Sequence, residues 1–462
     1  MTPKDAADTI AAISTPLGEA GIGIIRVSGP DAEKIARALF RPRRQRENFP
    51  SHHLYLGYIV DPASQEIVDE VLLTLMRAPR TYTREDVAEI QCHSGVGVLR
   101  RILALTLAQG ARLARPGEFT LRAFLSGRLD LTQAEAVLEV IQARTEAGLR
   151  VAADHLQGGL GRSVQKFRDN ILDLLALVEA ALDFPEETAE LSAEAFAGDL
   201  ARPIKDLETL AATYQEGRLL WEGLLVVIAG QPNVGKSSLL NCLLSQDRAI
   251  VTEIPGTTRD LVEEVITLAG MPVRLSDTAG LRPAQDRVEE LGIKRTRERL
   301  AQADLVLYLV DGSLALGPET RRDLEELGDR PGLAVVNKID LPQEIDISAL
   351  KEITKLPLAR ISALTGEGVE NLKQQIINLT VKHGLNTTGE IVTQARHYQH
   401  LQNCLGYLAQ ARELLASGEP APTWELVALE LQEAIRELGE ITGQEVGEEV
   451  LERIFTEFCL GK

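Results

Sequence analysis

The sequence has little cysteine and lacks any long hydrophobic run. Its four cysteines, Cys92, Cys242, Cys404 and Cys459, are scattered over 462 residues without a C-x-x-C pair. This distribution argues against a disulfide framework and a structural zinc site, and it indicates a reducing compartment. No apolar run approaches the length that spans a bilayer, and the first residues lack a signal-peptide pattern. We therefore expect a cytoplasmic protein with no membrane partner.

An excess of positive charge is also absent. The chain has 49 Lys and Arg against 68 Asp and Glu, which gives a formal net charge of −19. A protein with this net charge cannot use its whole surface to bind nucleic acid. The charge is uneven, because residues 1–119 carry 15 Lys and Arg against 14 Asp and Glu. If nucleic acid binds, a local patch or a basic partner must supply most of the phosphate contacts.

The length and the hydrophobic patterns predict several domains. Residues 1–119 mix short β-like stretches with helical segments, which is typical of an α+β domain. Residues 120–220 and 384–462 are helical, whereas residues 221–383 alternate apolar strands with helices, as in a parallel α/β sheet. A plain string of domains would leave the apolar stripes of both helical blocks unpaired. This favours one discontinuous helical domain with the α/β domain inserted into it.

Two smaller patterns in the second helical block also carry predictions. Thr442 and Glu445 have the spacing of a capping box, which predicts a helix start at Thr442. His397 and His400 lie three residues apart on an expected helix. We expect both histidines on the surface rather than as metal ligands.

The most specific motif is a glycine-rich loop that directly follows an apolar run. Residues 224–228 read LLVVI, which predicts a strand buried on both faces, and residues 230–237 fit G-x-x-x-x-G-K-[ST]. Such a loop wraps backbone N–H groups around a phosphate chain. The ammonium of Lys236 can reach the β- and γ-phosphates, and the hydroxyl of Ser237 can bind Mg²⁺. Taken alone, the motif is also compatible with a chance strand-to-helix turn.

Four further motifs follow in order. The segment 252–260 reads TEIPGTTRD, in which a threonine can bind Mg²⁺ and order the loop around a triphosphate. Asp277 in D-T-A-G can hold the metal through water. In N-K-I-D, the Asp340 carboxylate can accept from the N1–H and 2-amino groups of guanine, which adenine does not offer. A backbone amide near Ser362 can meet the guanine carbonyl. Together the motifs predict a GTPase domain.

The residues expected at GTP are Asn233, Val234, Gly235, Lys236, Ser237, Ser238, Thr252, Glu253, Ile254, Pro255, Gly256, Thr257, Thr258, Asp277, Thr278, Ala279, Gly280, Asn337, Lys338, Asp340, Ser362 and Ala363. One expected residue is missing. The position after D-T-A-G holds Leu281, whereas Ras-type enzymes place a water-orienting glutamine there. Either the intrinsic rate is very low or another group does this work. Asn233 and carbonyls of the 252–258 loop can hold a monovalent cation, and K⁺ there would replace an arginine finger.

The chain resembles the MnmE (TrmE) family of tRNA-modifying GTPases. The resemblance rests on GQPNVGKSSLLN, TEIPGTTRD, DTAGL, NKID and the ending FCLGK, together with DTIAAISTPLGEAGIGIIRVSG and ARPGEFTLRAFLSGRLDLTQAEAV. It covers essentially the full length, and GEFTLRAFL with the C-terminal ending is its specific part. It implies a multidomain α/β and α fold: an N-terminal α+β folate-binding-type domain, a discontinuous helical domain and an inserted Ras-like P-loop GTPase domain.

The resemblance also implies a reaction and partners. Such proteins form homodimers and act with MnmG, a flavin-dependent subunit, in a heterotetramer. Together they add an aminomethyl-type (carboxymethylaminomethyl) group at C5 of wobble uridine 34 of certain tRNAs. The implied one-carbon cofactor is 5-formyl- or methylene-tetrahydrofolate, and the implied folate residues are Arg26, Glu89, Arg128 and Lys462. A carboxylate such as Glu89 suits the amino-pyrimidinone edge of a pterin, and cations suit its glutamate tail.

For hydrolysis, the resemblance implies a potassium-dependent GTPase that is activated when two G domains meet. Its K⁺ ligands are Asn233, Thr252, Ile254 and Thr257, and its Mg²⁺ ligands are Ser237 and Thr258. Glu289 would orient the attacking water, so the catalytic set is Glu289, Asn233 and Lys236. Cys459 is a candidate nucleophile, although a lone cysteine near a helix end is more often a small buried residue.

Two other classes of function stay open from the sequence. A GTP-regulated ribosome-assembly or RNA-binding factor would have a similar G domain, but no G-x-x-G loop of KH type is found. A membrane-associated GTPase would need a basic amphipathic helix, which the sequence does not show. Folate binding by residues 1–119 would favour the tRNA-modifying enzyme over the assembly factor.

Overall fold

The computed structural model describes residues 8–45, 48–184, 192–247, 264–277, 299–328, 330–380, 390–416 and 424–462, with only the backbone of Gln246, Asp247 and Asp277. The chain forms two compact units. The first comprises Met1–Ile141, Ala153–Glu208 and Gln399–Lys462, and the second comprises Gln142–Ala152 and Thr209–Tyr398. In the part of the chain that is described, no helix is both long and apolar enough to cross a membrane.

A seven-stranded sheet with the order β3-β4-β5-β6-β2-β1-β7 organises the N-terminal part of the first unit. Every neighbouring pair is antiparallel except β1 and β7, which are parallel. The strands are β1 (Ile10–Ile13), β2 (Gly23–Ser28), β3 (Phe40–Pro42), β4 (His53–Val60), β5 (Ile67–Met76), β6 (Val87–Cys92) and β7 (Arg112–Leu113). The strands of this α+β domain lie close to the β-like stretches that the sequence indicated.

The two faces of this sheet are covered differently. Helices α1 (Ala32–Leu39) and α2 (Val96–Ala108) pack on one face, against alternate residues such as Ile25 of β2 and Ile90 of β6. Because successive strand residues point to opposite faces, Arg26 and Glu89 lie on the other face, and they are direct partners across β2 and β6. Helix α3 (Glu118–Leu125) packs its Phe119 near Ile10 of β1 on that face.

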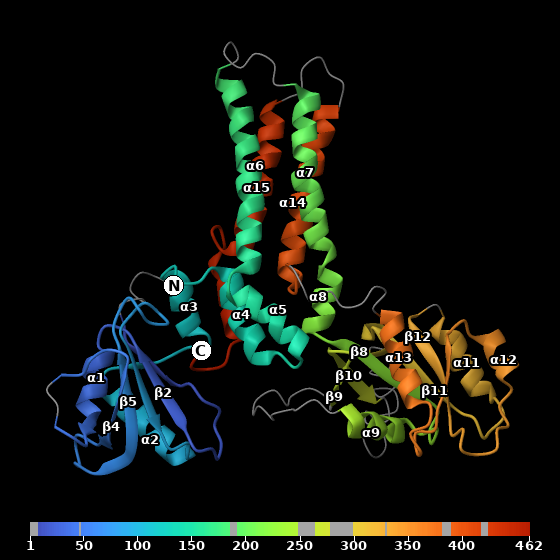
Figure 1. Ribbon diagram of the computed structural model, residues 1–462, viewed down its shortest axis with the longest axis horizontal. Helices are drawn as coiled ribbons and strands as arrows, with labels where there is room; N and C mark the ends of the chain where they lie inside the picture. The colour runs from blue at the N-terminus through green and yellow to red at the C-terminus, as the bar shows by residue number, and fades with distance from the viewer. Residues whose placement is uncertain are drawn as a thin grey trace, which may run out of the picture. The chain divides into compact units, whose positions relative to one another are not determined.

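The helices of the first unit include a bundle. Helices α6 (Gly159–Asp183), α7 (Ala193–Ala212), α14 (Ala395–Ala416) and α15 (Trp424–Thr442) run side by side (Figure 1). Val427, Leu431 and Leu438 form an apolar stripe of the second helical block and are buried on α15. Helix α15 packs against α6, so segments from both helical blocks share one core. The first unit also contains α16 (Glu448–Thr456) and all but the last residue of α4 (Leu131–Gln142), whereas most of α5 (Glu146–Leu156) belongs to the second unit.

The second unit contains a six-stranded sheet with the order β13-β12-β11-β8-β10-β9. Its strands are β8 (Leu224–Gly230), β9 (Glu264–Leu268), β10 (Met271–Asp277), β11 (Leu305–Asp311), β12 (Gly332–Asn337) and β13 (Leu358–Arg360). The helices α9 (Lys236–Asp247) and α13 (Val369–Thr380) share a core with one set of strand residues. The helices α11 (Pro318–Leu327) and α12 (Ile347–Ile353) share a core with the alternate set. This confirms the P-loop α/β architecture.

The sheet differs from the predicted parallel pattern at one edge. Strand β9, which the sequence reading missed, runs antiparallel to β10, while the remaining pairs are parallel. The two strands are joined by Ala269 and Gly270, which have φ angles of 49° and 83°. Positive φ at both turn residues is the geometry of the tight hairpins that match strand twist. The sheet is therefore mixed.

Two local predictions are wrong. Thr442 does not start a helix: it is the last residue of α15, its hydroxyl donates to the carbonyl of Gly439, and α16 begins after Gly447. The helix stops there because Gly443 takes a left-handed φ of 85°. His397 is not on the surface either, since it is 2% exposed on α14 and its Nε2 lies 3.0 Å from Nη2 of Arg396.

Candidate functional site

The glycine-rich loop leaves the carboxyl end of β8, which lies between β10 and β11 in the sheet. Gly230 and Gly235 have φ angles of 138° and 99°. A Cβ on Gly230 would lie 2.4 Å from the carbonyl oxygen of Leu309, and one on Gly235 would lie 2.3 Å from Nδ2 of Asn337. Both positions therefore need glycine, for backbone conformation and for space. The loop passes this close to its neighbours because it must turn directly into α9.

The polar groups of this loop suit a phosphate chain. Nζ of the buried Lys236 donates to the carbonyl oxygens of Gly230 and Gln231, at 2.9 Å and 2.8 Å. Ser237 and Ser238 are exposed in the first turn of α9, where the backbone N–H groups and the helix dipole favour an anion. Asn233 is exposed and has a left-handed φ of 63°. These are the residues predicted to contact GTP, K⁺ and Mg²⁺ from this loop.

A polar chain that the sequence did not reveal holds the start of the loop. Nε2 of Gln231 donates to Oδ2 of Asp323 on α11 at 2.7 Å, and the hydroxyl of Tyr308 on β11 donates to the same oxygen at 2.6 Å. Burial and the bond to Asp323 raise the pKa of Tyr308. Its hydroxyl therefore stays protonated and keeps donating. Gln231, the second residue of the loop, is thus linked directly to helix α11 and, through Asp323, to strand β11.

Asn337 connects the loop to the base-recognition residues. Its Nδ2 donates to the carbonyl oxygen of Val234 at 2.8 Å, and its Oδ1 accepts from the backbone N–H of Ala363 at 2.9 Å. Nζ of Lys338 lies 2.5 Å from Oδ2 of Asp311, the last residue of β11. Burial opposes ionisation of Asp311, but its bonds to Lys338 and Ser313 outweigh this effect and lower its pKa.

The structure therefore brings the described nucleotide residues to one edge of the sheet. The parallel strands β8, β12 and β13 all end at this edge. Among the residues that follow them, Asp340 is exposed and Ser362 is buried. Asp277 ends β10, in register with Ile228 of β8. The remaining predicted residues lie outside the described part of the chain: Thr252, Glu253, Ile254, Pro255, Gly256, Thr257, Thr258, Thr278, Ala279, Gly280 and Glu289.

A second group of polar side chains lies on the free face of the N-terminal sheet. Nε and Nη2 of Arg26 both lie 2.8 Å from Oε1 of Glu89. The two residues are far apart in sequence but adjacent in the β2–β6 register. The bonds described for Glu89 involve Oε1, so Oε2 keeps acceptor capacity for a ligand N–H group.

Two aromatic rings form the centre of this group, and the sequence analysis missed both. The Arg26 guanidinium carbon lies 5.8 Å from the ring centroid of Tyr82 and 5.7 Å from that of Phe119. The Arg128 guanidinium lies 4.8 Å from the Tyr82 centroid, and its Nη1 donates to the Tyr82 carbonyl at 3.2 Å. Cation–π contacts therefore connect Arg26 and Arg128 through Tyr82. The location of Phe119 within GEFTLRAFL was the one available signal.

The C-terminal segment completes the group. The carbonyl oxygen of Gly461 accepts from Oγ of Ser14 at 3.1 Å and from Nη1 of Arg26 at 3.4 Å, and that of Lys462 accepts from the N–H of Phe119 at 3.2 Å. Burial and nearby Arg26 lower the pKa of Lys462. We call Arg26, Tyr82, Glu89, Phe119, Arg128 and Lys462 the basic pocket. It contains all four residues predicted to bind folate.

Cys459 lies close to this pocket along the chain. It is exposed in the turn after α16, whereas the sequence favoured a small buried residue. The buried interpretation is therefore wrong. Exposure leaves the thiol accessible, but nothing described around it assigns it a chemical role.

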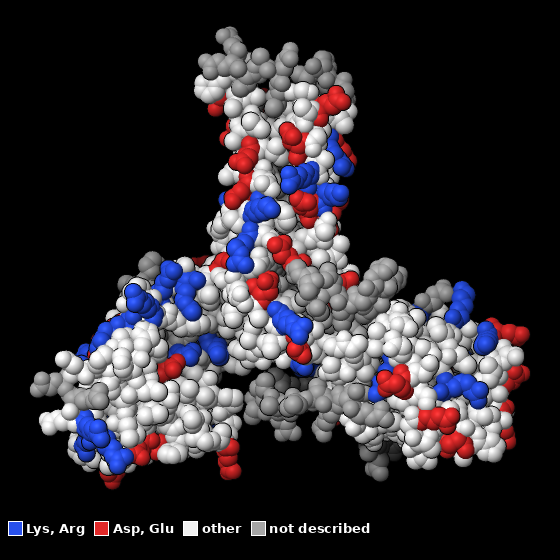
Figure 2. Space-filling view, in the orientation of Figure 1, with Lys and Arg blue, Asp and Glu red and all other residues white. Residues whose placement is uncertain are grey.

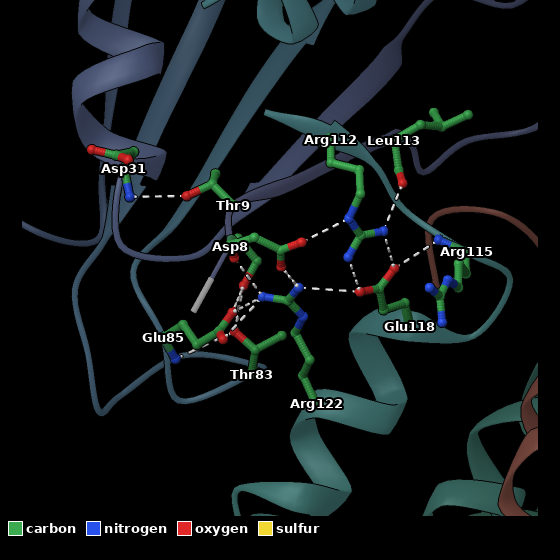
Figure 3. A network of polar contacts seen from close by, with 11 residues as sticks. Asp8, Thr9, Asp31, Thr83, Glu85, Arg112, Leu113, Arg115, Glu118 and Arg122 are labelled. Carbon is green, nitrogen blue, oxygen red and sulfur yellow. Dashed lines mark hydrogen bonds and ion pairs between the residues drawn. The ribbon is translucent and has the colours of Figure 1, made fainter. Parts of the chain in front are cut away.

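An ion cluster with a buried centre, Glu118 and Arg122 of α3, connects this helix to Asp8 and Glu85 (Figure 3). Arg122 donates from Nη2 to Oδ1 of Asp8 at 2.6 Å and from Nη1 to Oε1 of Glu85 at 3.1 Å. Arg112 donates to Oε1 of Glu118 at 2.7 Å and to Oδ2 of Asp8 at 2.7 Å. The pKa of Glu118 is affected most by burial, which raises it, but the bonds from Arg112, Arg115 and Arg122 outweigh burial and lower it. The cluster fixes the helix that carries Phe119.

The basic pocket has the groups that a folate needs. Glu89 offers an acceptor to the amino edge of a pterin, while Arg26, Arg128 and Lys462 place positive charge around one carboxylate. Tyr82 adds apolar surface for a flat ring, and the fully buried Phe119 belongs to the core against which Tyr82 packs. The nucleotide loop, by contrast, offers backbone N–H groups, one ammonium and hydroxyls, which suit phosphates and a hard cation.

Comparison with known proteins gives two family matches. A model of the MnmE helical domain matches residues 131–459, and a model of the GTP-binding protein TrmE N-terminus matches residues 9–128. The tRNA modification GTPase MnmE of Carboxydothermus hydrogenoformans is 47% identical over 463 residues, covering 98% of this chain and 99% of that protein. The protein of the same name from Moorella thermoacetica is 47% identical over 464 residues, with the same coverage.

Among solved structures, the G domain of the FeoB iron transporter of T. maritima is 30% identical to part of the chain. The match covers 34% of this chain and 98% of that one, with a TM-score of 0.27. A score this low supports no structural conclusion. The full-length relatives match nearly the whole chain, so family membership rests on them.

Proposed function

The chain belongs to the MnmE family of tRNA modification GTPases, and from this membership we propose that it hydrolyses GTP in order to modify tRNA. The observation that carries the proposal is full-length identity of 47% to an MnmE protein, together with a nucleotide loop and a base-recognition edge built as described. Mg²⁺ would bind at Ser237 and at Thr258, which lies outside the described residues. Lys236 would hold the β- and γ-phosphates, and Asp340 would select guanine.

The modification that we propose is an aminomethyl-type group at C5 of wobble uridine 34, made together with a flavin-dependent MnmG-type subunit. A tetrahydrofolate bound in the basic pocket would supply the one-carbon unit. The pocket supports this proposal because its charges match a pterin at one end and carboxylates at the other. Glu89 would orient the pterin through Oε2, and Arg26 would hold Glu89 in place through Oε1. Arg128 and Lys462 would bind the glutamate part.

Hydrolysis is proposed to depend on K⁺ and on the meeting of two G domains. Asn233 supports a cation site because its amide is exposed on a left-handed backbone, beside the loop that would hold the β- and γ-phosphates. Thr252, Ile254 and Thr257 would complete the K⁺ ligands and Glu289 would orient water, but these residues are outside the described part. A cation at this position would stabilise charge that develops in the transition state.

Reconstitution of the reaction tests the proposed function. The full chain, a flavin-dependent partner subunit, GTP, a tetrahydrofolate donor and unmodified tRNA are incubated, and the nucleosides are analysed by mass spectrometry. We expect a C5-modified uridine at position 34 that disappears with Glu89→Gln and remains with Arg41→Gln, a control on β3. Modification that proceeds equally without this chain would refute the proposal. Retention of full activity by Glu89→Gln would refute only the folate assignment.

A further inference from the structure

Beside the basic pocket, two exposed arginines, Arg80 and Arg84, extend the positive charge of Arg128 beyond the groups that the proposed reaction uses. Arg80 and Arg84 lie in the loop between β5 and β6, and Arg128 follows α3. All three are exposed, and no carboxylate that the structure describes forms an ion pair with any of them. Figure 2 shows Lys and Arg side chains gathering over the region that Figure 1 labels α3. We call these three residues the arginine edge.

The acidic residues Glu85 and Asp86 of the same loop, and Glu89 of β6, offset this charge little, because their carboxylates already have partners. Glu85 binds Arg122 and also accepts from Oγ of Ser28 at 2.7 Å. Asp86 accepts from the backbone N–H of Ala78 at 2.9 Å, and Glu89 binds Arg26. These carboxylates are thus bonded to other groups, whereas Arg80, Arg84 and Arg128 are exposed without an ion-pair partner among the described residues. In a chain with a net charge of −19, this local excess of positive charge is unusual and marks a place for an anion.

Two of the arginines are also held in position. Nη1 of Arg84 donates to the carbonyl oxygen of Ser126 at 2.8 Å, and Nη1 of Arg128 donates to that of Tyr82 at 3.2 Å. Each guanidinium keeps its remaining N–H donors for a ligand, in a planar fork that fits phosphate oxygens. Arg84 also has a left-handed φ of 61°, which a long side chain rarely adopts. Such conformations persist where the surroundings enforce them, often at binding sites.

We propose that Arg80 and Arg84 bind backbone phosphates of the tRNA, next to the nucleotide that is modified. Arg128 belongs both to the edge and to the basic pocket, so an RNA strand held along the edge places a base near the one-carbon site. Phosphate contacts of this kind fix the position of the RNA without reading its sequence. The inference rests on the proposed function, which makes tRNA the substrate.

The test compares two double variants of the full-length protein. Arg80→Gln with Arg84→Gln removes two edge cations and leaves Arg128 to the pocket. Arg41→Gln with Arg43→Gln removes the same charge on and after β3, where Arg43 pairs with Glu70. The dissociation constant for an unmodified tRNA transcript is measured by fluorescence anisotropy over a roughly fivefold range of salt. GTP hydrolysis without tRNA and binding of 5-formyl-tetrahydrofolate are measured on the same samples.

We expect the edge variant to bind tRNA about tenfold more weakly near physiological salt. Its plot of log affinity against log salt should be shallower by about 1.5, because each lost phosphate contact contributes about 0.7 to 0.9. Hydrolysis and folate binding should be unchanged, and the control variant should match the wild type in every assay.

Three outcomes would overturn the inference. The first is wild-type affinity and salt slope in the edge variant. The second is weaker folate binding with an unchanged tRNA slope, which would assign these arginines to the anionic tail of the cofactor. The third is loss of the dimer by light scattering, which would place them in a subunit interface. Failure of the wild type to bind tRNA would instead refute the proposed function itself, and the inference with it.

Discussion

Arg122 is the most constrained charged side chain of the N-terminal part. It is 3% exposed, and Glu118, one of its partners, is 2% exposed. In such a cluster the attraction between charges offsets the cost of taking each charge out of water. Removal of Arg122 leaves the buried Glu118 with Arg112 and the N–H of Arg115 as its remaining donors. Arg122 is also the residue of α3 that binds both Asp8 and Glu85.

We predict that Arg122→Met lowers the free energy of unfolding of this part of the protein by about 3–5 kcal/mol. The length of the side chain is kept, but Asp8, Glu85 and Glu118 lose a shared donor. Urea denaturation combined with hydrogen exchange of the α3 amides measures the change. Arg43→Met removes an exposed ion pair as a control and should cost less than about 1 kcal/mol. Equal losses of unfolding free energy in the two variants would show that the ion pairs of Arg122 stabilise the fold no more than an exposed ion pair does.

The same cluster predicts a dependence of stability on pH. Burial raises the pKa of Asp8 and of Glu118, but the arginine bonds outweigh it, so both values are lowered in the folded protein. A carboxyl group with a lowered folded pKa stabilises the fold fully above its unfolded value. This stabilisation is lost as the pH falls through the folded pKa. For Glu118 the loss should begin below its ordinary value of 4.5.

Glu118→Gln should therefore be less stable than the wild type at neutral pH and should lose less stability on acidification. A series of urea transitions from neutral pH to about pH 3 measures both effects. Parallel stability curves for the two proteins below pH 4.5 would contradict this assignment of the acid sensitivity. Asp8→Asn provides a second variant with the same expected sign.

At the scale of elements, the C-terminal segment depends on one backbone conformation. Gly461 has a φ of 90°, and a Cβ there would lie 2.4 Å from the carbonyl oxygen of Ile13. We predict that Gly461→Ala displaces Lys462 from the basic pocket and weakens 5-formyl-tetrahydrofolate binding about tenfold or more, on the scale of strained left-handed residues. Isothermal titration calorimetry measures the affinity, and GTP hydrolysis should not change.

Gly447→Ala is the matched control for this variant. Gly447 also lies near the C-terminus, but its φ is −72° and nothing lies within 4 Å of an added Cβ. We expect wild-type folate affinity from this change. If Gly461→Ala also binds folate normally, Lys462 is not part of the cofactor site.

The elements themselves were largely predictable because they follow simple periodicities. The strands of the nucleotide-binding sheet and the stripe of α15 bury the residues that the sequence indicated. Edge strand β9 was missed because its pairing depends on a two-residue turn at Ala269 rather than on an apolar run. The capping-box prediction failed because Thr442 is still part of α15, which ends only where Gly443 takes a left-handed φ.

The basic pocket was less predictable from residue patterns. Arg26 and Glu89 meet only because β2 pairs with β6 in one register, which no local pattern specifies. Their prediction came from the family resemblance, and the same source did not point to Tyr82 or Phe119. For Glu118 and Arg122 a local signal existed, since two opposite charges stand four residues apart in an otherwise apolar helix.

At the scale of the whole molecule, the segments that precede and follow the α/β domain lie close to each other. Within the second unit, Tyr214 and Tyr398 stack with ring centroids 4.4 Å apart, and the N–H of Val392 donates to Oγ1 of Thr213 at 3.0 Å. Close entry and exit points are what an inserted domain requires. They support the proposal that residues 221–383 are an insertion, with residues 120–220 and 384–462 as one helical domain.

Whole-molecule assembly leads to a prediction about hydrolysis. If two G domains must meet, the rate per protein molecule should rise with protein concentration until the dimer is saturated, and it should be higher in potassium than in sodium chloride. Asn233→Ala should abolish the potassium effect and leave GTP affinity within about threefold, because the phosphates are held mainly by the loop amides and Lys236. Rates equal in both salts for the wild type would exclude the cation role.

The contact between Ser14 and Gly461, which joins positions 447 residues apart, has a consequence for biosynthesis. As the ribosome makes this chain, the nucleotide-binding sheet is finished long before the segment that closes the basic pocket. A product that stops short of that segment would still bind GTP while lacking a complete site for the one-carbon donor. Under the proposed function, such a fragment would hydrolyse GTP without supporting the modification of tRNA.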